Sequence, residues 1–422
     1  MARQLRFIHG ADLHIGAPIR GLRAVPPAWA ERLAEAIPRA YDRLVEAALR
    51  HEVDFVAISG DVFDTTQASY GDYLRFFRGL ERLGAAGIPT YLCTGNHDPL
   101  SRWQPGFFEL PQGVRMLSSE RADFALFERD GEPLCVVGGR SYPNKVWAQE
   151  ADIAEGVTRA AAEQALGPRA AEAPFGVGVL HTGLFMDPHK APADPARLQE
   201  AGFDYWALGH IHRRYVDDEA CPRVAFSGCI QGRDIKETGP RGVNLVTLTE
   251  GAPNMVEFVP TASVALEMLT VDVSGCATLS AVSEAVMRAQ FRANGSARCE
   301  EMVSRVTLVG ATALHEVLAQ EGVLEDLRAA LNDSYADFLV DALVDRTTLP
   351  LDKGALRTEG LFPAALMQAA AAQRRAPQAQ QAMLQDAFMQ AKVTPPTLTD
   401  EAVEQLVAQA EDLVLDLLVR EG

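Results

Sequence analysis

The feature that most constrains this chain is a series of five short polar motifs, each placed directly after an apolar run of strand-like composition. In chain order the motifs are Asp12-Leu13-His14, Gly60-Asp61-Val62-Phe63-Asp64, Gly95-Asn96-His97-Asp98, His181-Thr182-Gly183 and Gly209-His210-Ile211-His212. Asp-x-His alone carries almost no information, and the Gly-Asp motif is a weak signal because Gly-Asp often marks a turn. Gly-Asn-His-Asp and Gly-His-x-His are each moderately specific. All five in this order indicate a single site, because the carboxyl ends of strands in an α/β sheet meet at one edge.

Strand-like and helix-like segments alternate through residues 1–262, which predicts a layered α/β domain with its helices outside. The expected strands span residues 5–9, 53–59, 88–94, 134–138, 177–181, 205–208, 224–227 and 243–248. Helical periodicity covers residues 29–50 and 70–83, and Pro38 is expected to kink or split the first helix.

A different pattern begins near residue 263. A β-α-β-α-β pattern, with one helix expected at 313–331, predicts a small α/β domain over residues 263–346. Residues 347–422 are expected to form a linker, up to Pro363, and then a helical C-terminal region. Its last helix has one apolar face, with Thr397 or Thr399 as N-cap.

The charge of the chain weighs against several classes of protein. The sum of 39 Lys and Arg against 57 Asp and Glu is −18, which disfavours a broad basic face for coating nucleic acid or an anionic membrane. From residue 263 onward, 12 basic and 23 acidic residues give −11, which leaves −7 for the first 262 residues. The acidic excess therefore lies mostly outside the region that carries the motifs, and a local basic channel stays compatible with it.

Cysteine usage and hydropathy point to a soluble cytoplasmic protein without a membrane anchor. The 6 cysteines are scattered and form no Cys-x-x-Cys pair, so neither a disulfide framework nor a thiolate zinc site is expected. The first apolar run is short and broken by Arg6, and no run approaches the roughly 18–20 residues of a membrane span.

The residue types in the five motifs are those of a metal site. Asp, Asn and His side chains supply oxygen and nitrogen ligands that suit Mn²⁺, Fe or Zn²⁺. Asp12 and His14, two residues apart in an extended turn, are expected to point to the same side. Asp61 can bridge two ions, and His210 and His212 can supply one imidazole to each. Two neighbouring ions of this kind promote phosphoryl transfer.

The ordered set resembles the calcineurin-like metallophosphoesterase superfamily over about residues 5–250. Three stretches are more narrowly similar to the SbcD-type DNA repair exonucleases and their YhaO-like branch: residues 7–16, residues 204–214, and residues 227–233 followed by 237–242. The resemblance implies a layered β-sandwich flanked by helices, followed by a small α/β capping domain and a helical tail. The chain after residue 262 fits these last two parts in outline.

The resemblance also implies a role for each site residue. One metal would be held by Asp12, His14, Asp61 and His212, and a second by Asp61, Asn96, His181 and His210. His97 would stabilise or protonate the leaving oxygen, and Asp64 would orient His97, although some relatives carry a histidine in place of Asp64. A role for His97 in contacting phosphate without proton transfer stays open. Mn²⁺ is the expected metal, with Fe, Zn²⁺ or Mg²⁺ as alternatives.

Three functions are compatible with these observations. The first is a metal-dependent exonuclease or endonuclease acting on DNA ends in repair, with a homodimer and an SbcC-like coiled-coil ATPase as expected partners. The second is a phosphodiesterase or phosphatase for small nucleotides, which would not need the long C-terminal part. The third is a DNA-end-tethering subunit of an ATPase complex with weak catalysis. Arg233, Lys236 and Arg241 are candidates either for phosphate contact or for a solvated loop, and His9 for packing.

Overall fold

The computed structural model describes residues 2–103, 109–350, 353–359, 361–390 and 398–421. The chain forms two compact units. The first comprises residues 1–268, 290–304 and 337–341, and the second comprises residues 269–289, 305–336 and 342–422. Segments of the expected domain at 263–346 contribute to both units, and the three-part division expected from the sequence stays a prediction.

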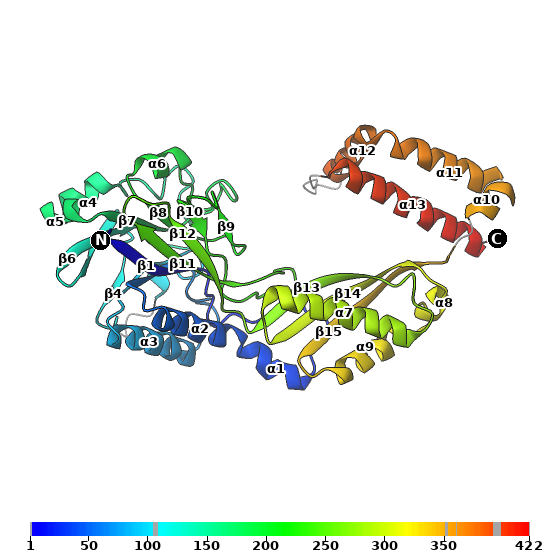
Figure 1. The fold of residues 1–422 in the computed structure, drawn as a ribbon, viewed down its shortest axis with the longest axis horizontal. Helices are drawn as coiled ribbons and strands as arrows, with labels where there is room; N and C mark the ends of the chain where they lie inside the picture. The colour runs from blue at the N-terminus through cyan, green and yellow to red at the C-terminus, as the bar shows by residue number, and fades with distance from the viewer. Residues whose placement is uncertain (1, 104–108, 351–352, 360, 391–397, 422) are drawn as a thin grey trace. The chain divides into compact units, whose positions relative to one another are not determined.

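The first unit contains two six-stranded sheets (Figure 1). The first sheet has the order β12-β11-β1-β2-β3-β4, with β1 (Gln4–Gly10), β2 (Phe55–Ser59), β3 (Thr90–Cys93), β4 (Val114–Met116), β11 (Gly242–Thr249) and β12 (Met255–Pro260). The second has the order β5-β6-β7-β8-β10-β9, with β5 (Asp123–Arg129), β6 (Glu132–Gly139), β7 (Phe175–His181), β8 (Tyr205–Gly209), β9 (Tyr215–Val216) and β10 (Val224–Phe226). Strands β1, β2 and β3 run parallel to one another, as do β6, β7 and β8.

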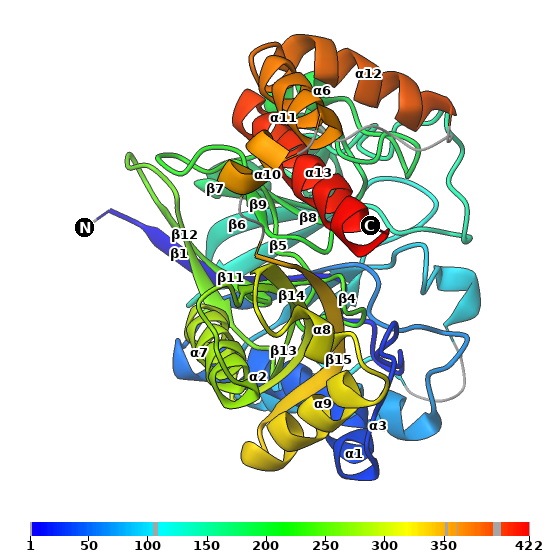
Figure 2. The ribbon, with the colours of Figure 1, turned by 90° about the vertical axis from the view of Figure 1, so that its right-hand side faces the viewer.

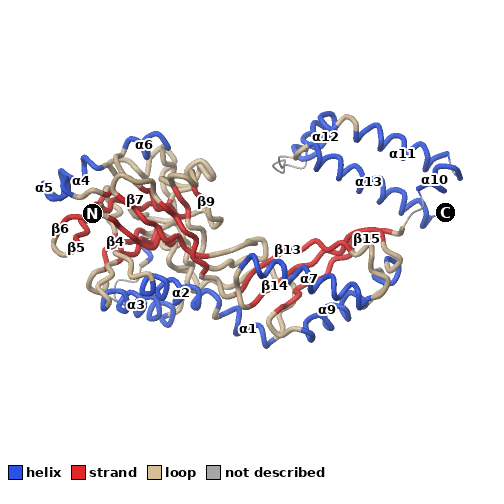
Figure 3. Tube along the Cα trace, in the orientation of Figure 1, coloured by secondary structure: helices blue, strands red, loops and turns tan. Residues whose placement is uncertain are grey.

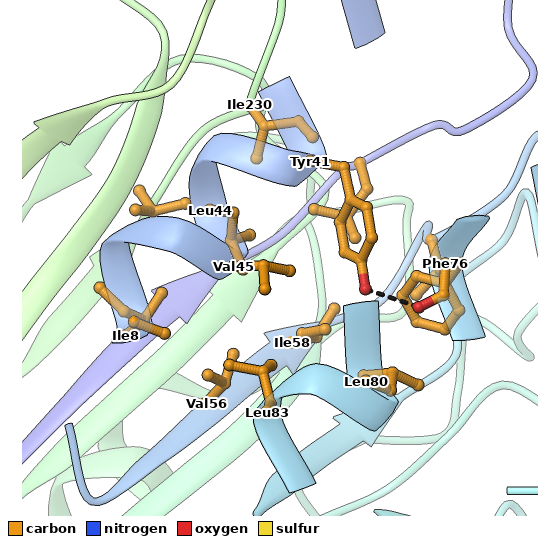
Figure 4. Close-up of a cluster of buried hydrophobic side chains, with 14 of the residues drawn as sticks. Ile8, Tyr41, Leu44, Val45, Val56, Ile58, Phe76, Leu80, Leu83 and Ile230 are labelled. Atoms are coloured by element: carbon orange, nitrogen blue, oxygen red, sulfur yellow. Dashed lines mark hydrogen bonds between the residues drawn. The ribbon is translucent and has the colours of Figure 1, made fainter. Parts of the chain in front are cut away.

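Three apolar clusters define the layers of this unit. One consists of side chains from both sheets, including Phe7, Phe55 and Tyr205, and lies between them. Another joins the first sheet to α2 (Ala36–Arg50) and α3 (Tyr70–Ala85), where the Tyr41 hydroxyl donates to the Phe76 carbonyl at 2.7 Å (Figure 4). A third covers the second sheet beneath α4 (Arg159–Leu166), α5 (Pro168–Glu172) and α6 (Pro195–Glu200). The expected layered α/β architecture is confirmed.

The helix expected over residues 29–50 is split, as predicted. Helix α1 (Pro27–Ala34) ends before Glu35, and α2 begins at Ala36 with Pro38 as its third residue. A proline is tolerated in the first turn of a helix, because the N–H that it lacks would have no partner within the helix. Helix α3 begins at a capping box in which Ser69 and Asp72 bond each other's backbone N–H.

A three-stranded sheet of order β13-β14-β15 follows, built from β13 (Val264–Asp272), β14 (Glu301–Ala311) and β15 (Phe338–Thr348). Along the chain, helix α7 (Leu279–Ala297) lies between β13 and β14, and helix α9 (Val323–Ser334) lies between β14 and β15 (Figure 2). The β-α-β-α-β pattern is thus present. The single helix expected at 313–331 is instead divided into α8 (His315–Leu318) and α9, because Gly322 between them has a φ of 87°.

The last part of the chain is helical (Figure 3), with α10 (Lys353–Glu359), α11 (Leu361–Arg374), α12 (Pro377–Gln390) and α13 (Asp400–Glu421). The linker expected at 347–363 is therefore wrong in its second half, since α10 and the first turn of α11 occupy it. Thr399 caps α13, accepting the Ala402 N–H at 3.2 Å, while Thr397 lies outside the described residues. Among the described residues, no helix has the length and apolarity needed to cross a membrane.

Candidate metal centre

The five motifs meet at one edge of the sandwich, as the sequence predicts. The first three follow β1, β2 and β3 of the first sheet, and the last two follow β7 and β8 of the second. Side chains from both sheets therefore converge, and two of the groups they form are Asp12 with His14 and His212, and Asp12 with Asp61 and His181. Within each group the candidate ligand atoms all lie within 4.8 Å of one another.

In the first group, two imidazoles face each other. The Nε2 atoms of His14 and His212 are 3.1 Å apart, and the Asp12 Oδ1 atom lies 4.0 Å and 3.8 Å from them, respectively. The other ring nitrogen of His14, Nδ1, is buried and has no hydrogen-bond partner among the described residues. Nitrogens and a carboxylate that converge in this way form the donor set of a divalent cation.

Asp61 lies between this group and the second set of donors. Its Oδ2 atom is 3.7 Å from His14 Nε2 and 3.4 Å from His181 Nε2. The His181 Nε2 atom is in turn 3.1 Å from the Asn96 Oδ1 atom. Asp61 thus occupies the position expected of a bridging ligand, with one candidate ion site on either side.

His210 is placed differently from the other candidate ligands. Its ring centre lies 5.3 Å from that of His181, but its Nε2 atom is paired with the Asp187 carboxylate at 3.1 Å. Its backbone N–H donates to the Asp12 carboxylate at 3.0 Å. Sequence reasoning missed Asp187, which lies outside the five motifs. The assignment of His210 as a ligand stays a prediction.

The backbone of the site is unusual at four of the candidate ligands. Asp12, His14, Asp61 and His210 have φ values of 52°, 47°, 51° and 105°, in the region that favours glycine. The extended turn expected for Asp12 and His14 is therefore wrong, although both side chains still reach the same group. Strained backbone of this kind persists where the surrounding structure imposes it, and it clusters at functional sites.

The glycine of the third motif allows a close approach. A Cβ atom at Gly95 would lie 2.2 Å from the Asp61 Oδ1 atom, which accepts the His97 backbone N–H at 2.8 Å. Asp98, to which the sequence assigned no role, is fully buried and accepts the N–H groups of Gly95, Asp61 and Val62 at 2.8–3.1 Å. In the sequence, the feature that could have identified Asp98 is its place as the last residue of the Gly-Asn-His-Asp motif.

His97 lies at the margin of the site. Its side chain is 34% exposed, and its ring centre is 4.8 Å from that of His14. The Asp64 Oδ2 atom lies 3.9 Å from His97 Nδ1 and 3.8 Å from the Arg233 Nη1 atom, while Thr66 donates to Oδ1 at 2.9 Å. At 3.9 Å the Asp64 and His97 side chains are near each other but too far apart for a hydrogen bond, and the orienting role of Asp64 stays a prediction.

Glu237 supports the site from a loop that carries no motif. Its Oε1 atom is 2.6 Å from His212 Nδ1, and its Oε2 atom accepts the Arg233 backbone N–H at 2.8 Å. Because a carboxylate can only accept, His212 Nδ1 donates to Glu237, and Nε2 is the ring atom that faces His14. Burial alone would lower the pKa of His212, but the bond to Glu237 outweighs burial and raises that pKa. Arg241 is buried and donates to the carbonyls of His212 and Thr238, so its guanidinium is engaged within the loop, and a contact with phosphate stays a prediction.

The charges of the site follow from these contacts. Burial alone would raise the pKa of Asp61, but His181 and His14 outweigh it and lower that pKa below its usual range. The Asp61 carboxylate in turn overcomes the effect of burial on His181 and raises its pKa to about 9. The metal-free site therefore holds an ionised carboxylate among imidazoles, and a divalent cation would take the place of the proton.

Comparison with known proteins agrees with this geometry. Residues 5–214 match the family model described as calcineurin-like phosphoesterase, and residues 267–348 match the middle domain of metallophosphoesterase YhaO. The chain is 32% identical over 344 residues to a Bacillus subtilis protein named uncharacterized metallophosphoesterase YhaO, covering 80% of this chain and 79% of that one. The chain belongs to the calcineurin-like metallophosphoesterase family.

Two further proteins are similar to this metallophosphoesterase. A Thermoplasma acidophilum protein named DNA double-strand break repair protein Mre11 is 26% identical over 256 residues, which cover 58% of this chain and 62% of that one. The solved structure of TT1561 from Thermus thermophilus has 15% identity and a TM-score of 0.36, covering 61% of this chain and all of the other.

The site of this metallophosphoesterase fits the two divalent metals that its family typically uses. Asp12, His14 and His212 would hold one ion, Asn96 and His181 the other, and Asp61 lies between them. These donors are oxygen and imidazole nitrogen. Cys229 forms a further group of possible metal ligands with His212 and Glu237. In that group, however, Glu237 is bonded to His212 Nδ1, the ring nitrogen that does not face His14.

Proposed function

We propose that this metallophosphoesterase is a Mn²⁺-dependent nuclease that hydrolyses phosphodiester bonds at DNA ends. The observation that carries the phosphoester chemistry is the position of Asp61, which is buried between two groups of donors with His97 at their margin. The choice of DNA is supported by the relative named for double-strand break repair, which covers 58% of this chain. The carboxylate and amide oxygens suit Mn²⁺, while the imidazoles also suit Fe or Zn²⁺, so Mn²⁺ is the first metal to test.

The residues of the chain divide the work of such a reaction. When bound, two divalent cations supply Lewis-acid stabilisation of the oxygens that attack and leave phosphorus. Asp12, His14, Asp61, Asn96, His181, His210 and His212 hold these cations in the proposal. His97 is exposed enough to reach a substrate, and in its protonated imidazolium form it would give a proton to the leaving oxygen and become neutral, with Asp64 as the neighbouring carboxylate that would orient the ring.

The proposal is tested by replacing His97. With Mn²⁺, the purified protein is expected to degrade labelled DNA, and His97→Ala should lower turnover by about 10²–10⁴-fold, the typical contribution of a general acid. Bound Mn²⁺, measured by elemental analysis, should stay unchanged, because the proposal does not assign His97 as a ligand, although His97 lies in a candidate group with His14 and Asp61. His51→Ala, a histidine at the end of α2, serves as the matched control.

The substrate panel should include mononucleotides and cyclic nucleotides beside single-stranded, blunt and overhanging DNA. Faster turnover of the small nucleotides than of DNA would indicate a small-molecule phosphodiesterase that uses the same chemistry. Wild-type turnover by His97→Ala would remove the assignment of His97 as acid.

A further inference from the structure

A loop beside the metal centre presents two adjacent apolar side chains to solvent. The loop, residues 183–190, begins two residues after His181, and in it Phe185 is 52% exposed and Met186 is 37% exposed. Single exposed apolar side chains are common on protein surfaces and assign nothing by themselves. Here, however, the next residue is Asp187, whose carboxylate is bonded to His210. The exposed pair is therefore tied directly to the candidate metal centre.

The backbone of this loop is held in one shape. The Gly183 N–H donates to the Lys190 carbonyl at 2.8 Å, and the Asp187 N–H donates to the Gly183 carbonyl at 2.9 Å. The Thr182 hydroxyl donates to the Ala191 carbonyl at 2.6 Å. These bonds close the loop at its base and constrain the backbone that carries Phe185.

Phe185 stands against a second aromatic ring. Its ring centre is 5.6 Å from that of Tyr215 on β9, with an interplanar angle of 74°. Tyr215 is itself 6.4 Å from the buried ring of Phe226 and packs against the apolar cluster of the second sheet. The edge-to-face contact braces Phe185 from one side and leaves much of its surface open.

Both aromatic residues lie close to candidate ligands along the chain. Phe185 is the fourth residue after His181, and Tyr215 is the third after His212. Their backbones therefore lie at most about 14 Å from those ligands, since a chain extends by no more than about 3.6 Å per residue. A nucleotide whose phosphate lies at the metals is of the size needed to bring its base, or a neighbouring base, to this pair.

We propose that Phe185 and Tyr215 form a base-stacking platform that binds an unpaired nucleobase near the cleaved end of a DNA strand. This inference rests on the proposed nuclease function and specifies its substrate as single-stranded or frayed ends. Stacking on aromatic rings is tolerant of base sequence. It also supplies affinity without phosphate neutralisation, which suits a chain of net charge −18.

The experiment compares Phe185→Ala with the wild type on two sets of oligonucleotides. One set is intact single-stranded DNA, and the other carries an abasic residue at one of the three terminal positions in turn. For the wild type, at one of these positions, loss of the base should raise KM about ten-fold without changing kcat. Phe185→Ala should raise KM by a similar factor on intact DNA and add nothing on that abasic strand. Phe362→Ala, a 62% exposed phenylalanine in the second unit, is the matched control.

Binding is measured separately, with 2-aminopurine placed at the same positions and the metal-loaded His97→Ala variant as the protein. Stacking should quench its fluorescence, and the added Phe185→Ala change should abolish the quenching. Equal wild-type KM values on intact and abasic strands, with no quenching, would refute the stacking platform without contradicting the proposed hydrolysis of DNA. Quenching without DNA hydrolysis by the wild type would instead refute the nuclease function and leave the platform in place.

Discussion

At the scale of single residues, the site depends on side chains that orient the ligands as well as on the ligands themselves. The residue types and spacing of the five motifs were enough to predict the side chains that converge. Asp187 and Glu237 could not be found in this way, because a carboxylate that bonds the far side of a histidine needs no fixed distance in sequence. The left-handed backbone at Asp12 could not be predicted from the sequence either, since it is imposed by the packing around it.

Glu237 is the orienting residue whose effect can be measured most directly. In Glu237→Gln the amide can present an N–H to His212, which would favour the wrong tautomer of that ligand. Mn²⁺ affinity is expected to fall by about 10–100-fold at one of two sites, as is typical when a ligand histidine loses its orienting carboxylate. Calorimetric titration of Mn²⁺ into metal-free protein measures this. Glu250→Gln, which breaks only a surface pair with Arg3, is the control, and equal affinities for the two variants would show that Glu237 does not orient His212.

At the scale of elements, the strands that carry the site were predictable and several others were not. Strands β4 and β9 span three and two residues, too few for any periodic pattern. Strand β12 lies at the edge of its sheet and has no fully buried residue. The pairing of two separate sheets, which brings β1 near β8, depends on contacts distant in sequence.

His9 links β1 to β8 across the sandwich. It is fully buried, with its Nδ1 atom 3.0 Å from the Tyr205 hydroxyl and its Nε2 atom 3.1 Å from the Leu208 carbonyl. The expectation of a packing histidine is thus met. Burial lowers the pKa of His9 to about 3, so the folded protein keeps it neutral. The unfolded chain binds a proton near pH 6.5, and stability is therefore lost as the pH falls from 6.5 toward 3.

Because folding keeps His9 neutral, the free energy of unfolding should depend on pH. From pH 7.5 to pH 5, His9 should contribute about 2 kcal/mol to the loss of unfolding free energy. In His9→Gln, which cannot titrate, the loss over this range should be smaller by about that amount, even if the variant is less stable at every pH. Urea denaturation at both pH values measures the difference. An identical pH dependence in the two proteins would mean that His9 is not held neutral.

At the scale of the whole molecule, the metal centre joins the two sheets of the first unit. Its donors come from the ends of β1, β2 and β3 in one sheet and of β7 and β8 in the other. Asp12 and Asp61 are each only 1% exposed, so bound cations would neutralise carboxylates that water cannot reach. Residues 263–422 carry a net charge of −11, but none of the five motifs lies in this part of the chain, because every motif precedes residue 213.

Metal binding should therefore stabilise the fold. With free Mn²⁺ at about 100 times its dissociation constant, the unfolding free energy should rise by about 2.7 kcal/mol per site, seen as a higher Tm. Asp61→Asn should lose most of this increase, because it removes the bridging charge, and elemental analysis should find less metal. Full occupancy in Asp61→Asn, with the same rise in Tm, would contradict the bridging role.

The left-handed backbone at Asp12 and Asp61 has a consequence for how such a site changes over generations. Besides glycine, asparagine is among the residues that adopt this conformation most readily, and a single nucleotide change converts an aspartate codon into an asparagine codon. The substitutions easiest for the backbone are thus those that remove charge from the cations. Descendants of this chain that lose activity should keep their fold and carry asparagine at these two positions, as intact scaffolds available for binding roles.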